Sequence, residues 1–403
     1  RRSRCRVAGG LRLAARVHRR SPRVYIDPAP LCRKRPRAPW PSRRIAGWAA
    51  GRAATTHCRA MGLPRHVLVV LSFFLCVHVH DATSSNPTKF LIVSTPRASK
   101  VSYMRIPSDS LSLKGSANAQ QQMKTLIGVG LVHPQGIAVD AKRSLLLVAD
   151  PDSKRIFAYP LSSDDTTLSV GDPLVFAEDV ESRWVTVDTR GNAIFSDEPR
   201  NQILRIKHGQ ALKNTTPEVL FDGKTLSQVS APGGVASDAF HSYWVNKQTG
   251  TQTGSLIQAD VDHAAESSTS TAGFAAEAIA KNTDKSYGVC LSLRSIYYTQ
   301  PQQVLFGIKK TGGSVVKITD RLENPRGCAW DGDGTVYVAD RGANAVYSFP
   351  GNMPELSALE LTRVVNYEDA FGVAVYSGAA MAQIWGSLLV CLSALNLARN
   401  DNR

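Results

Sequence analysis

The chain has 403 residues, of which 48 are Lys or Arg and 33 are Asp or Glu, and its formal net charge is +15. The charge is uneven, because residues 1–60 hold 17 basic residues against one acid, Asp27, and the rest of the chain carries −1. This near-neutral remainder argues against a nucleic-acid-binding domain, which needs a basic face.

Residues 1–60 show no apolar periodicity, and we expect this basic leader to be disordered. It is either a nucleic-acid-binding arm or sequence upstream of the translation start, since the first methionine is Met61. We favour the second interpretation, because residues 61–85 then have the plan of a secretory signal peptide. A short basic start is followed by the apolar run Val67–Val79 and by small and polar residues up to Ser85.

The stretch 324–350 shows the β-rich unit from which the fold is predicted. Three short apolar runs are separated by Asp331-Gly-Asp-Gly334 and by Asp340–Asn344. Asp-Gly between β-rich runs favours a tight hairpin, because Gly readily adopts positive φ. The stretch therefore predicts a three-stranded antiparallel meander.

The same unit recurs along the chain. Its anchor is a residue, usually Gly, that precedes a short apolar strand, and the six anchors are Gly136, Trp184, Gly234, Gly288, Gly327 and Gly372. A period of roughly 40–50 residues with four strands per unit is typical of a β-propeller. We predict six antiparallel blades of four strands, hence 24 strands, within residues 88–377.

The two ends of this domain predict how the ring closes. Phe90–Val93 matches the second strand of a unit, whereas Gly372–Tyr376 matches a first strand with no second strand after it. We expect the C-terminal strand to join the N-terminal blade as its innermost strand. The polar stretches 107–123 and 261–276 are expected to form loops between third and outer strands.

The repeat resembles a known family. The pattern Pro-x-Gly-(Ile/Cys)-Ala-x-Asp, then Tyr-Val-Ala-Asp, then Asn-x-(Ile/Val)-x-x-Phe is similar to the NHL repeat and is clearest in 324–349. Tyr243-Trp-Val-Asn246 resembles the YWTD repeat of lipoprotein-receptor propellers. The resemblance implies a six-bladed all-β propeller, with gluconolactonase-like propellers as distant relatives, and it implies no single function.

Candidate binding residues ring one end of the predicted channel, just before the inner strands. They are Gln135, Glu181, Arg183, Tyr287 and Arg326. Arg183 and Arg326 either clamp an anionic group such as a peptide carboxylate or pair with Glu181, Glu323 or Glu368, and we favour the pairing. The strand-end residues Asp150, Asp197 and Asp340 are expected to accept backbone N–H groups at turns rather than to catalyse.

Two enzyme families within the resemblance imply a metal. In gluconolactonase-type propellers Glu, Asn and Asp hold a divalent cation, and only Glu181 matches; Arg326, Gln135 and Gly233 occupy the other positions, so calcium is unsupported. In the amidating lyase several His ligands converge on zinc, whereas here His133 alone is near the mouth. We therefore predict no metal or other cofactor and no catalytic residue.

The remaining features concern the secretory pathway. Cys290 and Cys328 lie in adjacent inner strands one register apart, so we expect them to face opposite ways; they either pair or stay free, and we favour free thiols. Asn214 is the usable glycosylation sequon. Residues 378–403 form an apolar tail that is a lipid-anchor signal, a membrane span or a docked helix, and residues 378–398 are the candidate membrane attachment.

Together these features predict a monomeric propeller that is secreted or tethered at the cell surface and binds an extracellular protein, a peptide or an anionic ligand. The alternative is a metal-dependent hydrolase of the gluconolactonase (lactonase or esterase) class. The sequence does not name the ligand.

Overall fold

A computed structural model describes residues 88–378, apart from 108–122, 211, 213–214, 249, 251–253, 261–275, 282–284 and 302. All of them belong to the second of two units of the chain, Asp81–Arg403. The leader, the signal peptide, Asn214, the tail after residue 378 and nearly all of the two predicted polar loops lie outside the described residues.

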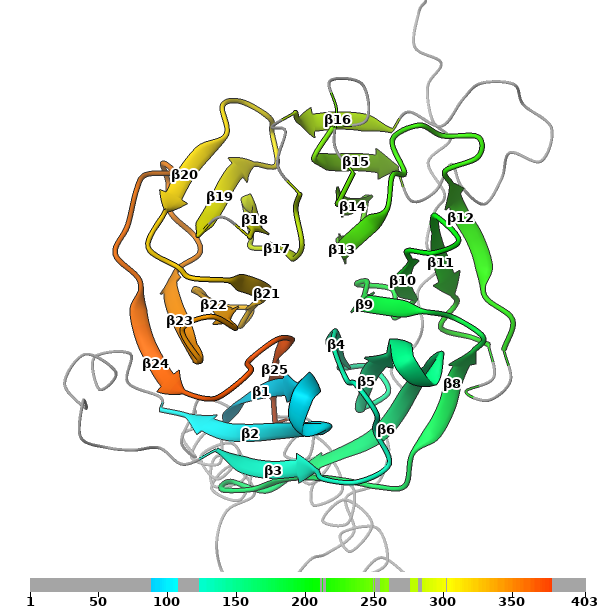
Figure 1. Cartoon of the computed structure of the whole chain (residues 1–403). Helices are drawn as coiled ribbons and strands as arrows, with labels where there is room; N and C mark the ends of the chain where they lie inside the picture. Colours follow the sequence, from blue (N-terminus) through cyan, green and yellow to red (C-terminus); the bar gives the residue numbers. More distant parts are fainter. Residues whose placement is uncertain are drawn as a thin grey trace, which may run out of the picture. The chain divides into compact units, whose positions relative to one another are not determined.

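The described part is a six-bladed β-propeller, as predicted (Figure 1). Each blade is an antiparallel sheet whose strands follow one another from the axis outward. From blade 1 to blade 6 the inner strands are β25 (Val373–Ser377), β4 (Ile137–Asp140), β9 (Ser182–Val187), β13 (Pro232–Ser237), β17 (Val289–Leu291) and β21 (Pro325–Trp330). The second strands are β1 (Lys89–Thr95), β5 (Leu145–Asp150), β10 (Ala193–Asp197), β14 (His241–Asn246), β18 (Ser295–Gln300) and β22 (Thr335–Asp340).

The third strands are β2 (Lys100–Ile106), β6 (Arg155–Ser163), β11 (Gln202–Ile206), β15 (Leu256–Asp260), β19 (Val304–Lys309) and β23 (Ala345–Pro350). The outer strands are β3 (Lys124–Ile127), β8 (Leu174–Glu178), β12 (Glu218–Asp222), β16 (Glu277–Ala280), β20 (Val316–Thr319) and β24 (Thr362–Asn366). One short strand, β7 (Leu168–Val170), was not predicted; it pairs with the long end of β6, so the described residues hold 25 strands instead of 24. Two 3-10 turns, η1 (Pro96–Ala98) and η3 (Pro151–Ser153), join second to third strands.

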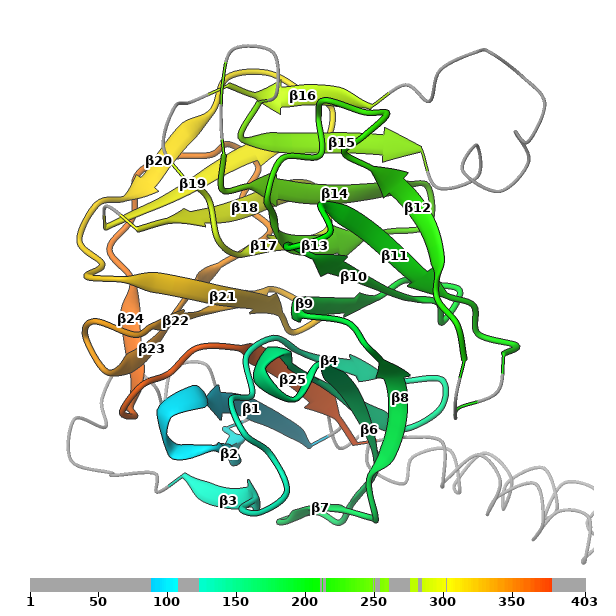
Figure 2. The same cartoon turned by 45° about the vertical axis from the view of Figure 1, so that its right-hand side comes forward.

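Ring closure agrees with the prediction. The C-terminal strand β25 pairs antiparallel with β1, with Leu91 opposite Val375, and becomes the innermost strand of blade 1 (Figure 2). Both ends of the described domain therefore lie together, and the Gly378 amide donates to the Thr88 carbonyl at 2.9 Å. Closure of this kind leaves little exposed sheet edge.

The anchor glycines are explained by close contact between neighbouring blades. A Cβ at Gly136 would lie 2.6 Å from the Arg183 carbonyl oxygen of the next blade, and one at Gly234 would lie 2.7 Å from that of Tyr287. Both glycine amides also donate to those same carbonyls, at 2.9 and 2.6 Å. Only a residue without a side chain allows this approach of two backbones.

The next-to-last residue of the second strand alternates between apolar and hydroxyl side chains around the ring. Second strands of even-numbered blades carry Ala149, Val245 and Ala339, whereas those of odd-numbered blades carry Ser94, Ser196 and Thr299. In blades 1 and 5 the hydroxyl links two neighbouring blades, because it accepts one hydrogen bond and donates another. The Gly372 amide donates to Ser94 Oγ at 2.8 Å and the Gly288 amide to Thr299 Oγ1 at 2.9 Å, and each hydroxyl donates onward to a carbonyl of the next blade. Blades 2, 4 and 6 thus bond to the next blade directly and blades 1 and 5 through a hydroxyl, whereas Ser196 Oγ of blade 3 is buried without a hydrogen-bond partner among the described residues.

The strand-end aspartates have the structural role that was predicted. Asp150 accepts from the amides of Val132 and His133 at 2.7 and 3.0 Å, and Asp340 accepts from those of Glu323 and Asn324 at 2.7 Å. Each buried carboxylate fixes the loop that leads into the inner strand of its own blade.

The favoured alternative for the cysteines, two free thiols, is wrong, because Cys290 and Cys328 form a disulfide between the inner strands of blades 5 and 6. The physical reason lies in how blades stack. One face of a sheet packs on the opposite face of its neighbour, so side chains that point in opposite senses within their own sheets are the ones that meet. Cys290 accordingly packs with Val336 and Val338 of blade 6.

Candidate functional site

A channel runs along the axis of the propeller, bounded by the inner strands. Its volume is about 270 Å³. Each inner strand pairs on one side only, so its other edge faces the axis. We call the end where the inner strands begin the mouth, and the other end the opposite face. Loops from outer to inner strands and from second to third strands surround the mouth.

Aromatic side chains lie across the mouth. Trp184, which stands where five other blades have the anchor glycine, stacks on Phe371 of the closing segment with ring centroids 5.3 Å apart. Both are more than nine-tenths buried, and Trp184 Nε1 is buried without a hydrogen-bond partner among the described residues. The mouth therefore contains an indole donor that nothing in the described part of the protein satisfies.

Cations gather around Tyr287 beside this aromatic pair. The Arg326 guanidinium lies 4.1 Å from the centre of the Tyr287 ring, and Lys247 Nζ lies 5.7 Å from it. Both distances are within the range of a cation–π interaction. Three blades thus contribute a positive charge or an aromatic ring to one point of the mouth.

The nearby carboxylates are already engaged. Glu198 pairs with Arg183 at 3.1 Å and with Lys247. Asp369, which is buried, pairs with Arg341 at 2.5 Å and accepts from the Arg97 amide at 2.6 Å. Both of these carboxylates at the mouth are therefore paired with cations.

Arg326 differs from the other cations. Its guanidinium donates to the Pro325 carbonyl at 3.3 Å and covers Tyr287, and among the described residues it forms no ion pair with a carboxylate. Burial lowers its pKa, and the charge of Arg341 acts in the same direction, whereas Tyr287 and Asp340 oppose the shift. Burial likewise lowers the pKa of Lys247, although Glu198 opposes this; Arg183 and Arg326 reinforce it. Both shifts show positive charge held in a partly desolvated place.

The structure places the five predicted residues in three different settings. Arg183, Tyr287 and Arg326 meet at the mouth. Gln135 is only 3% exposed, and its carbonyl accepts from Ser94 Oγ. Glu181 pairs with Lys154 at 3.1 Å.

Three important residues at the mouth were missed: Glu198, Lys247 and Arg341. Each directly follows the polar residue that ends a second strand. In the loop to the third strand this position lies beside other mouth residues: Glu198 pairs with Arg183, Lys247 lies over Tyr287 and Arg341 lies over Phe371. Inspection of the repeat at that position would therefore have found all three.

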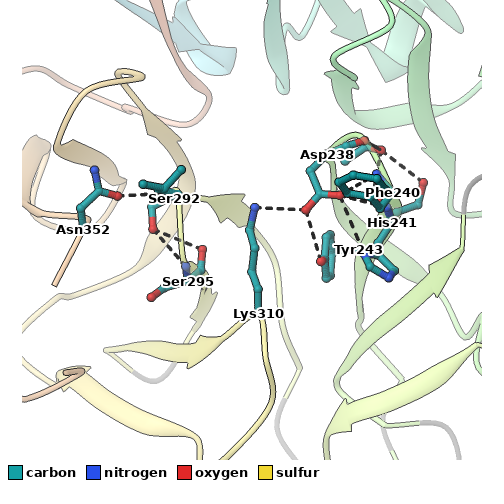
Figure 3. Close-up of polar contacts among 11 residues, drawn as sticks. Asp238, Phe240, His241, Tyr243, Ser292, Ser295, Lys310 and Asn352 are labelled. Atoms are coloured by element: carbon teal, nitrogen blue, oxygen red, sulfur yellow. Dashed lines mark hydrogen bonds and ion pairs between the residues drawn. The ribbon is translucent and has the colours of Figure 1, made fainter. Parts of the chain in front are cut away.

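The opposite face carries a different polar network, which links blades 4, 5 and 6. Lys310 Nζ contacts Asp238 Oδ2 at 3.1 Å, and the amide of Leu293 donates to Asn352 Oδ1 at 3.2 Å (Figure 3). Asp238 also accepts from the amides of Phe240 and His241 at 3.0 and 2.9 Å. All of these bonds hold turns or join blades, so we assign this network to structure.

Two kinds of feature are absent from the described residues. No group of three or more His, Cys, Asp or Glu side chains in that part could hold a metal ion. Within the same residues, no helix has the length and apolar character needed to cross a bilayer.

Comparison with known proteins supports the fold alone. No family model matches the chain, and no curated protein matches it by sequence. A chain from the crystal structure of a nidogen/laminin complex is 14% identical over 72% of this chain and 98% of its own, with a TM-score of 0.52. A putative 6-phosphogluconolactonase from Bacteroides fragilis (12% identity, 74% and 100% coverage, TM-score 0.48) and virginiamycin B lyase from Staphylococcus aureus (12%, 58% and 69%, 0.39) also match. The predicted six-bladed propeller is confirmed as a fold by the sheet topology, and the likeness with a TM-score of 0.52 agrees with it.

Proposed function

We propose that this protein is an extracellular or surface-tethered propeller that binds an anionic group of a partner protein at its mouth. One observation carries the proposal: Arg326 is a partly buried arginine without a carboxylate partner in the described part, beside Lys247 and the unsatisfied Trp184 Nε1. A desolvated positive charge is costly unless an anion approaches it. Guanidinium binds carboxylate in a bidentate manner, which suits an acidic side chain or a chain terminus.

The arrangement supports binding better than catalysis. A general acid or base needs a titratable group that is free to exchange protons with a substrate, whereas Glu198 and Asp369 are both held by cations. The secretory location rests on the apolar run 67–79 and gains support from the disulfide between Cys290 and Cys328, since disulfides persist mainly in oxidising compartments.

The test is binding of a fluorescent hexaglutamate peptide, followed by anisotropy at low salt. We expect Arg326→Gln to weaken binding by about 10- to 100-fold, the loss of one charge-assisted bond. The control is Arg321→Gln in the loop that leads into β21; the Arg321 side chain is 74% exposed and pairs with Glu360, so the change should alter affinity less than about twofold. Equal affinity of both variants would overturn the anion site.

Location and partners are tested separately by proximity labelling on cells that express the chain with its tail. Labelling of extracellular proteins that decreases with Arg326→Gln would support the proposal. Turnover of a lactone or ester that Glu181→Ala abolishes would instead favour the hydrolase.

A further inference from the structure

From the opposite face we infer a second contact, independent of the mouth: this face lies against a lipid bilayer, with Phe240 and Leu293 entering the headgroup layer. Phe240 is 72% exposed and Leu293 is 61% exposed. They lie at the tips of the first hairpins of blades 4 and 5, which are neighbours in the ring.

These apolar tips are held in place, so their exposure is a built feature. Asp238 accepts from the Phe240 amide, Asn352 accepts from the Leu293 amide, and Lys310 bridges the two blades through Asp238 (Figure 3). Fixed, exposed large apolar side chains on adjacent turns mark a contact surface.

Charge on the same face suits a bilayer. The corresponding hairpin tips of blades 2 and 3 carry the exposed cations Lys142 and Arg190, and Arg294 follows Leu293 directly. Basic residues next to apolar ones favour lipid phosphate groups outside the apolar layer. Blade 6 is the exception, since its tip carries the exposed Asp333, which pairs with Lys89.

The position of the two chain ends favours a lipid bilayer as the partner of this face. Every inner strand runs from the mouth to the opposite face, so β25 ends there at Ser377, beside the start of β1. The sequence that continues from this point contains the apolar run 384–395. If this apolar run inserts into a bilayer, the face that exposes Phe240 and Leu293 is the one brought to that membrane.

The test is hydroxyl-radical footprinting of the full chain with and without phosphatidylcholine vesicles, alone or with 30% phosphatidylserine. We expect oxidation of Phe240 and Leu293 to fall at least about fivefold on the vesicle-bound protein, and further with the anionic lipid. Val129, 86% exposed in the loop that leads to blade 2 on the mouth side, is the internal control and should be oxidised equally in both states.

Two outcomes would overturn the inference: no association with either vesicle, or bound protein in which Phe240 and Leu293 stay as reactive as in solution. The second outcome would mean that the tail attaches the protein while this face stays in water. As a further check, Phe240→Ser/Leu293→Ser should release the bound protein at least about tenfold more readily, whereas Val129→Ser/Val132→Ser should not.

Discussion

The disulfide between Cys290 and Cys328 offers a quantitative test of how the ring is held. The bond joins residues 38 apart and encloses most of blade 5 in one covalent loop. In the chain-entropy model a loop of this length removes about 13 cal/mol/K from the unfolded state, which corresponds to about 4 kcal/mol at 25 °C. For a domain of this size that stabilisation is about 7 °C in melting temperature.

The perturbation is the double variant Cys290→Ala/Cys328→Ala, and the assay is thermal unfolding followed by circular dichroism. Without reductant we expect it to melt about 7 °C below the wild type, and with reductant the two should approach each other as the wild type loses its bridge. Cys391→Ala, in the tail, is the matched control and should melt like the wild type. Equal melting of double variant and wild type without reductant would refute the reasoning, as would peptide mapping that finds both thiols free.

The ring closure and one buried tyrosine yield further predictions. Deletion of residues 370–376 removes the inner strand of blade 1, so soluble expression and the melting temperature should both collapse; a truncated chain that melts normally would contradict the closure. Burial, aided by the charge of Asp150, raises the pKa of Tyr159 to about 12. The pKa of Tyr159 is higher in the folded than in the unfolded state, so the neutral tyrosine stabilises the folded state fully below about pH 10. As pH rises toward 12 this contribution to the free energy of unfolding is lost, by up to about 1.4 kcal/mol per pH unit. Tyr159→Phe should therefore flatten the fall of the urea midpoint between about pH 10 and 12, and an unchanged slope would count against it.

The fold could be predicted because its determinants are local and repeated. Each anchor glycine indicates a close backbone contact, and each strand-end aspartate indicates a turn. The repeat unit is weak in any one copy, but six copies together predict a ring. Closure could be inferred from strand type at the two ends. The extra strand β7 escaped prediction because β6 simply continues past its blade, and Asp164 then turns the chain by accepting from the Thr166 and Thr167 amides at 2.7 and 2.6 Å.

The site was predicted less well, for a different physical reason. Alternation along one strand tells which side chains share a face, but it does not tell which face meets the neighbouring blade. This gap produced the error on Cys290 and Cys328. It also hid the pairing of Arg183, whose partner Glu198 lies in the turn after β10 and not among the three acids considered.

The direction of the inner strands connects the two proposals. Because all six run away from the mouth, both ends of the domain leave from the opposite face, and any tether through either end leaves the mouth pointing outward. Arg326 and Phe240 therefore belong to surfaces that face different surroundings, and neither contact network includes a residue of the other. Loss of the membrane contact should leave anion binding by the isolated protein unchanged, so the two proposals can be tested and refuted independently.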